Sequence, residues 1–264
     1  MDLQLKGKRA LVTGASAGIG WAIARELAAE GAEVVLNARD PRRLADAVAR
    51  IREHLPAAAV RGVAADLADA AGCAALLAGA GDADILVNNL GIFDPRPFEA
   101  IRDDEWQRFF EINVMSGVRL ARHHLPAMKR RGWGRIVFIS SESGICPPAE
   151  MVHYGMTKSA QLSISRGLAE TCAGTGVTVN AVLPGPTRTE GALDFFGKLA
   201  AEAGQTLQQA ERDFFAHARP TSIIKRFVEP AEVAGMVAYV CSPRAAATNG
   251  AALKVEGGVV RSLI

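Results

Sequence analysis

The sequence predicts an α/β protein in which a buried, parallel β-sheet carries helices on both faces. Short apolar runs that suit buried strands alternate with amphipathic helical segments along the whole chain. A glycine-rich turn separates the first strand from the first helix, and no repeat, low-complexity stretch or linker interrupts the order. Such alternation requires crossover connections that keep the strands parallel. We therefore expect one domain that covers residues 1–264.

The composition argues against a nucleic-acid-binding, membrane or metal-binding protein. The 264 residues carry a formal net charge of +2, and the arginines are scattered without a basic stripe. No uncharged apolar run reaches the ~18 residues of a membrane span, and no signal peptide follows Met1. Four well-separated cysteines form no Cys-x-x-Cys motif, which favours reduced thiols over disulfides or metal ligands. We expect a cytoplasmic protein.

A phosphate-binding turn is predicted between the first strand and the first helix. The strand spans Arg9–Thr13, and the helix continues as far as Gly31. Between them stands a Gly-x-x-x-Gly-x-Gly pattern formed by Gly14, Gly18 and Gly20. Backbone N–H groups and the positive end of the helix suit a pyrophosphate, and the missing side chains let it come close. A turn with a purely structural role is the alternative.

The end of the second strand is the place where a dinucleotide's adenosine ribose would be recognised. Glu33–Ala38 forms that strand, and Arg39 stands just beyond it. An acidic residue here binds the 2′-hydroxyl of NAD, whereas an arginine suits the 2′-phosphate of NADP. Arg39 therefore favours NADP, with a solvated surface arginine as the alternative. Asp40 and Pro41 are expected to begin the next helix.

The remaining elements continue the alternation. Asp69 is expected to cap a short alanine-rich helix. The fourth strand runs into Asn88-Asn89-Leu90-Gly91, where two amides and a glycine leave backbone beside a ligand unless they form a plain turn. Further strands are expected at Ala59–Ala65, Asp84–Val87, Val177–Leu183 and Ala251–Val255, and a last helix at residues 229–239.

A long helix is predicted from Asp103 to about Arg131. Its acidic start and basic end both suit the helix dipole. Asn113 lies in the middle of this helix, where asparagine is a poor helix former. Pro126 should kink or restart the helix, because proline lacks a backbone N–H.

The central motif is a tyrosine and a lysine four residues apart. Tyr154 and Lys158 share one face of a helix expected over residues 154–172. The ordinary pKa of tyrosine, ~10, is too high for proton exchange at neutral pH, and a fixed ammonium nearby lowers it. Ser141 ends the strand Arg135–Ser141, at the edge that faces a ligand crevice in such sheets. An exposed helix pair is the alternative for the tyrosine and lysine taken alone.

Residues 190–226 interrupt the alternation after Pro184–Thr189. Two amphipathic segments in this region each contain a pair of phenylalanines, Phe195-Phe196 and Phe214-Phe215. We expect helices that fold over the crevice as a substrate lid. The alternative is that these phenylalanines only pack against one another.

Taken together, the motifs resemble those of the short-chain dehydrogenase/reductase family of the single-domain type, over essentially the whole chain. This resemblance implies a Rossmann-type, doubly wound sheet of seven parallel strands in the order 3-2-1-4-5-6-7. It also implies a nicotinamide dinucleotide and a homotetramer or homodimer. The matching residues, in family order and near family spacing, are Thr13-Gly14-x-x-x-Gly18-x-Gly20, Asn88-Asn89-x-Gly91, Asn113, Ser141, Tyr154-x-x-x-Lys158 and Pro184-Gly185.

The resemblance also implies catalytic roles for four residues. Tyr154 matches the acid/base, and Lys158 matches the residue that lowers the tyrosine pKa and holds the nicotinamide ribose. Ser141 matches the hydrogen-bond donor to the substrate's carbonyl oxygen. Asn113 matches the asparagine that holds a water linking the lysine to solvent.

The expected dinucleotide site extends along the carboxyl edge of the sheet. Leu90 replaces the alanine that is usual in the family. Ala17 stands where many NADP-dependent members carry a basic residue, so the expectation of NADP depends on Arg39 and NAD stays possible. The expected cofactor-binding residues are Gly14, Ser16, Ala17, Gly18, Ile19, Gly20, Asn37, Arg39, Asp66, Leu67, Asn89, Gly91, Tyr154, Lys158, Pro184, Gly185, Thr187 and Thr189.

These features predict an NADP(H)-dependent oxidoreductase that interconverts a ketone and a secondary alcohol, with a 3-oxoacyl thioester as one candidate substrate. An NAD(H)-dependent dehydrogenase of a small sugar, polyol or cyclic alcohol is one alternative, and a non-catalytic dinucleotide-binding regulator is another. Retention of the serine, tyrosine, lysine and asparagine together argues against the regulator. The residues expected to contact substrate are Glu142, Ser143, Cys146, Met151 and Phe195.

Overall fold

The computed structural model describes residues 1–263 and contains one seven-stranded parallel sheet. The strand order is β3-β2-β1-β4-β5-β6-β7, as the family resemblance implies. Each strand lies within one or two residues of its expected place. The strands are β1 Arg9–Val12, β2 Glu33–Ala38, β3 Val60–Ala64, β4 Ile85–Asn88, β5 Gly134–Ile139, β6 Val177–Pro184 and β7 Ala252–Val255.

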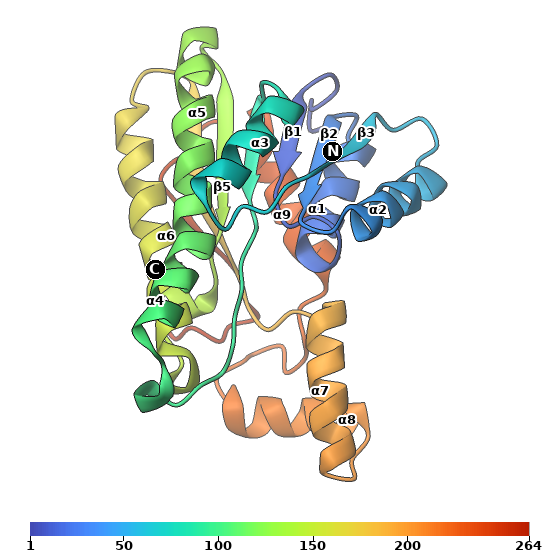
Figure 1. The fold of residues 1–264 in the computed structure, drawn as a ribbon, viewed down its shortest axis with the longest axis vertical. Helices are drawn as coiled ribbons and strands as arrows, with labels where there is room; N and C mark the ends of the chain where they lie inside the picture. The colour runs from blue at the N-terminus through green and yellow to red at the C-terminus, as the bar shows by residue number, and fades with distance from the viewer. Residues whose placement is uncertain (264) are drawn as a thin grey trace.

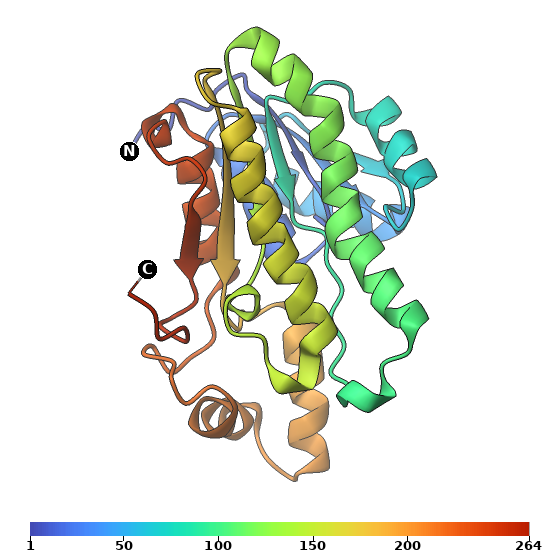
Figure 2. The same ribbon diagram turned by 90° about the vertical axis from the view of Figure 1, so that its left-hand side faces the viewer.

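Helices cover both faces of the sheet (Figures 1 and 2). One hydrophobic cluster joins the sheet to α1 (Gly18–Ala29), α2 (Pro41–His54) and α9 (Pro230–Cys241). The other joins it to α3 (Ala70–Ala80), α5 (Ser116–Arg131) and α6 (Val152–Thr171). Every residue of β5 and β6 is buried, as expected for parallel strands with both faces covered.

Side-chain caps fix where two of the helices begin. Asp40 accepts hydrogen bonds from the backbone N–H groups of Arg42 and Arg43, at 2.8 and 3.3 Å, and Pro41 occupies the first helical position of α2. Asp69 accepts a hydrogen bond from the N–H of Gly72 at 2.8 Å and so begins α3. Both capping predictions are confirmed.

The long helix predicted over residues 103–131 is interrupted near its middle rather than at its proline. It consists of α4 (Asp103–Phe110), a π-helical turn over Glu111–Met115, and α5. The prediction that the helix restarts at Pro126 is wrong, because α5 continues through that residue. Proline frees the carbonyl of Arg122 from its helical partner, and both residues are exposed, so water can satisfy this group. The interruption contains Asn113 instead.

Two further helices lie apart from the layers that cover the sheet. They are α7 (Glu190–Glu202) and α8 (Leu207–Asp213), and a π-helical turn over Phe214–Ala218 follows α8. Figure 1 shows α7 and α8 at the bottom of the molecule, and Figure 2 shows β6 and β7 pointing toward that end. The helices α7 and α8 therefore lie at the carboxyl edge of the sheet, where the predicted site residues gather. Within residues 1–263, no helix is long and apolar enough to cross a membrane.

The ring of Phe138 on β5 is the largest fully buried side chain and gives a test of this packing. A Cβ on Gly117 of α5 would lie 2.9 Å from the ring, so the ring packs closely against the backbone of this helix. We expect Phe138→Ala to lower the free energy of unfolding in urea by about 3–5 kcal/mol. The control is Phe110→Ala on α4, where the ring is 39% exposed and the change should be near 0.5 kcal/mol. A loss as small as that of the control would contradict the packing of β5 against α5.

Candidate active site

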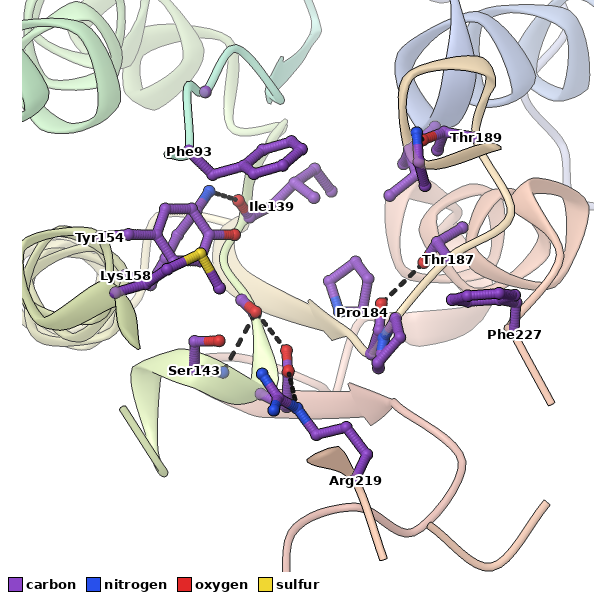
Figure 3. A pocket seen from close by; sticks show the side chains of 18 of the residues that line it. Phe93, Ile139, Ser143, Tyr154, Lys158, Pro184, Thr187, Thr189, Arg219 and Phe227 are labelled. Atoms are coloured by element: carbon purple, nitrogen blue, oxygen red, sulfur yellow. Dashed lines mark hydrogen bonds and ion pairs between the residues drawn. The ribbon is translucent and has the colours of Figure 1, made fainter. Parts of the chain in front are cut away.

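A cavity of about 400 Å³ lies at the carboxyl ends of β4, β5 and β6 (Figure 3). Tyr154 and Lys158 line one side, and Thr187 and Thr189 line the other. The predicted site residues that line this cavity are Ile19, Asn89, Gly91, Ser141, Glu142, Ser143, Met151, Tyr154, Lys158, Pro184, Gly185, Thr187, Thr189 and Phe195.

The glycine-rich turn is shaped by contacts that exclude side chains. Gly14 has a φ of +62°, in the left-handed region that favours glycine. A Cβ on Gly20 would lie 2.3 Å from the carbonyl oxygen of Gly14 and 2.4 Å from Nδ2 of Asn89. That amide donates hydrogen bonds to the carbonyl oxygens of Thr13 and Gly14, at 2.9 and 3.0 Å. Asn89 thus joins the end of β4 to the turn after β1.

The start of α1 fits a bound pyrophosphate. The helix begins at Gly18, and its N-cap residue Ala17 makes no side-chain capping bond, so the first N–H groups are free to bind an anion. Ser16, in the same turn, is half-buried. These residues could therefore hold the phosphates of a dinucleotide, with close approach allowed by the glycines.

The adenosine end differs in part from the expectation. The side chain of Asn37 is buried and donates to the carbonyl oxygens of Val63 and Ala65, both at 3.1 Å, so it joins β2 to β3. Leu67 is also buried and belongs to a hydrophobic cluster. These two side chains are therefore not available to a ligand. Asp66 and Arg39 are exposed at the ends of β3 and β2, and within residues 1–263 Arg39 makes no hydrogen bond or ion pair.

The predicted serine, tyrosine and lysine come together at the end of β5. Tyr154 and Lys158 lie one turn apart on α6, with the lysine Nζ 5.5 Å from the centroid of the tyrosine ring. Ser141 caps a short 3-10 turn, accepting a hydrogen bond from the N–H of Ser143 at 3.1 Å. Its hydroxyl donates to the carboxylate of Glu142.

A buried polar network surrounds Lys158 and includes a residue that sequence reasoning missed. The ammonium donates to the carbonyl oxygen of Ile139 at 2.9 Å and to Oε1 of Gln161 at 3.3 Å. The Gln161 amide in turn donates to the carbonyl oxygen of Asn113 at 2.6 Å. A backbone carbonyl oxygen can accept two hydrogen bonds, so the expectation that Asn113 holds a water on the path to the lysine stays a prediction. The spacing of three residues from Lys158 was the available signal for Gln161.

Asn113 also holds the chain that follows β4. Its side-chain oxygen accepts from the N–H of Ile92 at 2.8 Å, and its amide donates to the Ile92 carbonyl at 2.9 Å and to the hydroxyl of Thr157 at 3.0 Å. These hydrogen bonds use both polar side-chain atoms of Asn113, a residue that is unfavourable in the middle of a helix. The π-helical turn that contains Asn113 thus connects the chain after β4 to α6.

Most of the expected substrate contacts lie at the cavity, but one does not. Glu142, Ser143, Met151 and Phe195 line the cavity, whereas Cys146 is exposed and lies outside its lining. The cysteine falls in the loop between the turn Glu142–Gly144 and the short turn that precedes α6, where the chain faces solvent. Lining residues that the sequence did not indicate include Phe93, Glu150 and Phe227, whereas Phe196, Phe214 and Arg219 belong to the expected lid region.

The two phenylalanine pairs that were expected to fold over the crevice, Phe195-Phe196 and Phe214-Phe215, differ in their surroundings. Phe196 packs against Phe214 and Phe227, with ring centroids 4.9 and 5.0 Å apart, and all three line the cavity. Phe195 also lines the cavity and is 41% exposed. Phe215 is buried and lies outside the lining, so for this residue the packing alternative holds.

Comparisons with known proteins identify the family. The family model described as enoyl-(acyl carrier protein) reductase matches residues 14–260. The chain belongs to the short-chain dehydrogenase/reductase family. The uncharacterized oxidoreductase YvaG of Bacillus subtilis is 48% identical over 263 residues and is covered completely, as is this chain.

Two solved members of the family are similar over nearly the whole length. The L-sorbose reductase of Gluconobacter frateurii, complexed with NADPH and L-sorbose, is 34% identical with a TM-score of 0.93, and both chains are covered completely. A variant of actinorhodin polyketide ketoreductase with NADPH is 33% identical with a TM-score of 0.86, covering 97% of this chain and 98% of that one.

Burial shifts the pKa values of both Tyr154 and Lys158 in this short-chain dehydrogenase/reductase. Burial and the neighbouring Glu142 carboxylate raise the pKa of Tyr154, while a hydrogen bond with Ser141 opposes them. The tyrosine is half-buried, so solvent in the cavity moderates this effect. Burial lowers the pKa of Lys158 to about 8, although Glu142 favours the ammonium. Burial is thus the largest influence on the pKa of Tyr154 in this structure, and the expected lowering by Lys158 stays a prediction.

The buried ammonium of Lys158 predicts a pH-dependent stability difference. Above about pH 8 the folded enzyme releases a proton that the unfolded chain keeps up to about pH 10.5. Wild-type stability should therefore rise with pH across this window relative to Lys158→Met, by up to about 3 kcal/mol at ~1.4 kcal/mol per pH unit. Urea unfolding of both proteins from pH 7 to pH 10.5 measures the difference. Lys198→Met, at an exposed position of α7, is the control, because its stability should differ from that of the wild type by the same amount at every pH. If the stability difference between the wild type and Lys158→Met is equally independent of pH, the buried charge is contradicted.

Proposed function

We propose that the enzyme interconverts a ketone and a secondary alcohol with NADP(H) as cofactor. The observation that carries this proposal is that the Ser141 hydroxyl and the Tyr154 phenol line the same cavity as Lys158. A polarising hydroxyl beside a proton donor is the arrangement that reduction of a carbonyl group requires.

Each of these residues has a task in the proposed reaction. When bound, the nicotinamide supplies or accepts the hydride. Ser141 donates a hydrogen bond to the ketone oxygen and stabilises the negative charge that develops there. Tyr154 gives its proton to that oxygen, and its raised pKa keeps the phenol protonated at neutral pH. Lys158 holds positive charge beside the phenol, and Asn113 positions it through Gln161.

The proposal for the cofactor rests on the two ends of its expected site. The glycine-rich turn fits a pyrophosphate, and among residues 1–263 the Arg39 side chain has no partner that competes for a 2′-phosphate. The L-sorbose reductase and the actinorhodin ketoreductase, both similar in fold, are each described with NADPH. An NAD(H)-dependent dehydrogenase is the alternative, since Ala17 offers no second basic group.

Other parts of the proposal follow from the sequence patterns and, for the oligomeric state, from the family resemblance. We propose a single domain with residues 190–226 as a lid over the substrate, and assembly into homodimers or homotetramers in the cytoplasm. A non-catalytic regulator is disfavoured, since binding a dinucleotide does not require Ser141 and Tyr154 to face one cavity.

The proton donor can be tested with a matched pair of tyrosines, since the sequence contains only two. Tyr154→Phe should lower kcat for ketone reduction by at least ~10²–10⁴-fold, the range for general acid/base catalysis, with little change in NADPH affinity. Tyr239→Phe alters an exposed ring on α9 and should leave kcat unchanged. Equal turnover by the two variants would rule out Tyr154 as the acid.

Arg39 is the test of the cofactor. Charge-assisted hydrogen bonds to a phosphate are worth ~1.5–3 kcal/mol, so Arg39→Ala should weaken NADPH binding by roughly 10- to 150-fold. NADH has no phosphate at this position, and its affinity should barely change. Arg130→Ala, exposed at the far end of α5, controls for the loss of one surface charge. The measurement is a binding titration with each dinucleotide. If Arg39→Ala leaves the ratio of NADPH affinity to NADH affinity unchanged, the NADP assignment is contradicted.

A further inference from the structure

A buried carboxylate stands beside the serine of the proposed active site. Glu142 directly follows Ser141, is 6% exposed and lines the cavity. Arg219 reaches it from the lid, with Nε 3.7 Å from Oε1, and lies on the same side of the cavity as Ser143 (Figure 3). Arg219 also pairs with Glu150, at 3.4 Å. The serine therefore shares its end of the cavity with two carboxylates and one guanidinium.

The hydrogen bonds of Glu142 leave unused acceptor capacity. One carboxylate oxygen, Oε2, accepts from the Ser141 hydroxyl. The other, Oε1, has only Arg219, at a distance longer than a hydrogen bond. An ionised carboxylate can accept about four hydrogen bonds and donates none. Within residues 1–263, Ser141 is the only side chain that donates a hydrogen bond to this carboxylate.

Catalysis would remove this single donor. The Ser141 hydroxyl carries one hydrogen, so when it donates to a ketone oxygen it can no longer donate to Glu142. A buried carboxylate left without a donor is costly, and more so than a neutral group. A substrate that brings a replacement donor close to its own carbonyl oxygen avoids this cost. A hydroxyl on the carbon next to the carbonyl group could donate to Glu142 while Ser141 donates to the carbonyl oxygen.

We propose that Glu142 selects ketones that carry a hydroxyl on the adjacent carbon, such as ketoses and other polyhydroxylated ketones. This inference rests on the proposed function and names its substrate class. In the reverse direction the substrates are vicinal diols. The substrate hydroxyl donates to Glu142 as Ser141 turns to the carbonyl oxygen, so the buried carboxylate keeps a donor throughout.

The same contact disfavours the other substrate classes. A 3-oxoacyl thioester has a methylene group next to its ketone and beyond it a second carbonyl, which can only accept hydrogen bonds. It brings no donor to Glu142. An anionic substrate gains little from Arg219, because that guanidinium is already paired with Glu142 and Glu150. A neutral, hydroxylated ketone fits this end of the cavity best.

The experiment compares two ketones that differ only by hydroxyl against methyl, hydroxyacetone and butanone, at saturating NADPH. The wild-type enzyme should favour hydroxyacetone in kcat/KM by about 10- to 150-fold, the worth of one charge-assisted hydrogen bond. Glu142→Gln keeps the size of the side chain but removes its charge and should lower this preference. Glu142→Met removes both acceptors and should bring the ratio near one. Acetoacetyl thioester serves as a third substrate and should be the poorest.

Glu53→Gln is the matched control. Glu53 is an exposed carboxylate on α2 that lies outside the lining of the cavity, so the ratio should stay at the wild-type value. A wild-type ratio near one, a ratio unmoved in both Glu142 variants, or better turnover of the thioester overturns the inference and leaves the proposed function standing. If Glu142→Met does not fold, Glu142→Gln decides. Absence of turnover with all three substrates and either dinucleotide overturns both.

Discussion

The contact between Asn89 and the glycine-rich turn is the constraint on which the site depends. The strand order reverses between β1 and β4, and ligands of open α/β sheets bind at such a point. Asn89 follows β4, yet its amide donates to the carbonyl oxygens of Thr13 and Gly14 after β1. This close approach leaves no room for a Cβ at Gly20. The glycine-rich turn after β1 and the carboxyl end of β4 are thereby held together.

The sequence was sufficient for the fold and for the proposed site residues that follow a strand or share one face of a helix. Apolar runs, caps such as Asp40, and the spacing of Tyr154 and Lys158 are local signals, and each corresponds to local geometry in the structure. The contact of Glu142 with Arg219 joins residues 77 positions apart, and no periodicity reports such a pair. The burial of Asn37 was missed for a similar reason, since its partners belong to the neighbouring strand β3.

The site is assembled at a cost to stability. Burial opposes the charge on Lys158, which two acceptors and the Glu142 carboxylate only partly offset. The same carboxylate raises the pKa of Tyr154, so one acidic residue favours the ammonium and disfavours the phenolate. Both effects keep the pair in the state with a protonated phenol beside a positive charge. This is the state that can give a proton to a developing alkoxide.

The proposed lid, residues 190–226, makes charged contacts of different strength at both ends of the cavity. At the phosphate end, Arg50 donates to the carbonyl of Ser16 and pairs with Glu190 of α7, where both side chains are largely exposed. Such pairs contribute at most ~1 kcal/mol, so this attachment opens easily. At the serine end, the contact of Arg219 with Glu142 is buried, and breaking it leaves a charge without its partner. Separating the proposed lid from the sheet would therefore cost most at Glu142, beside the hydroxyl that we propose binds the substrate's oxygen, and a substrate that supplies its own donor there would lower that cost.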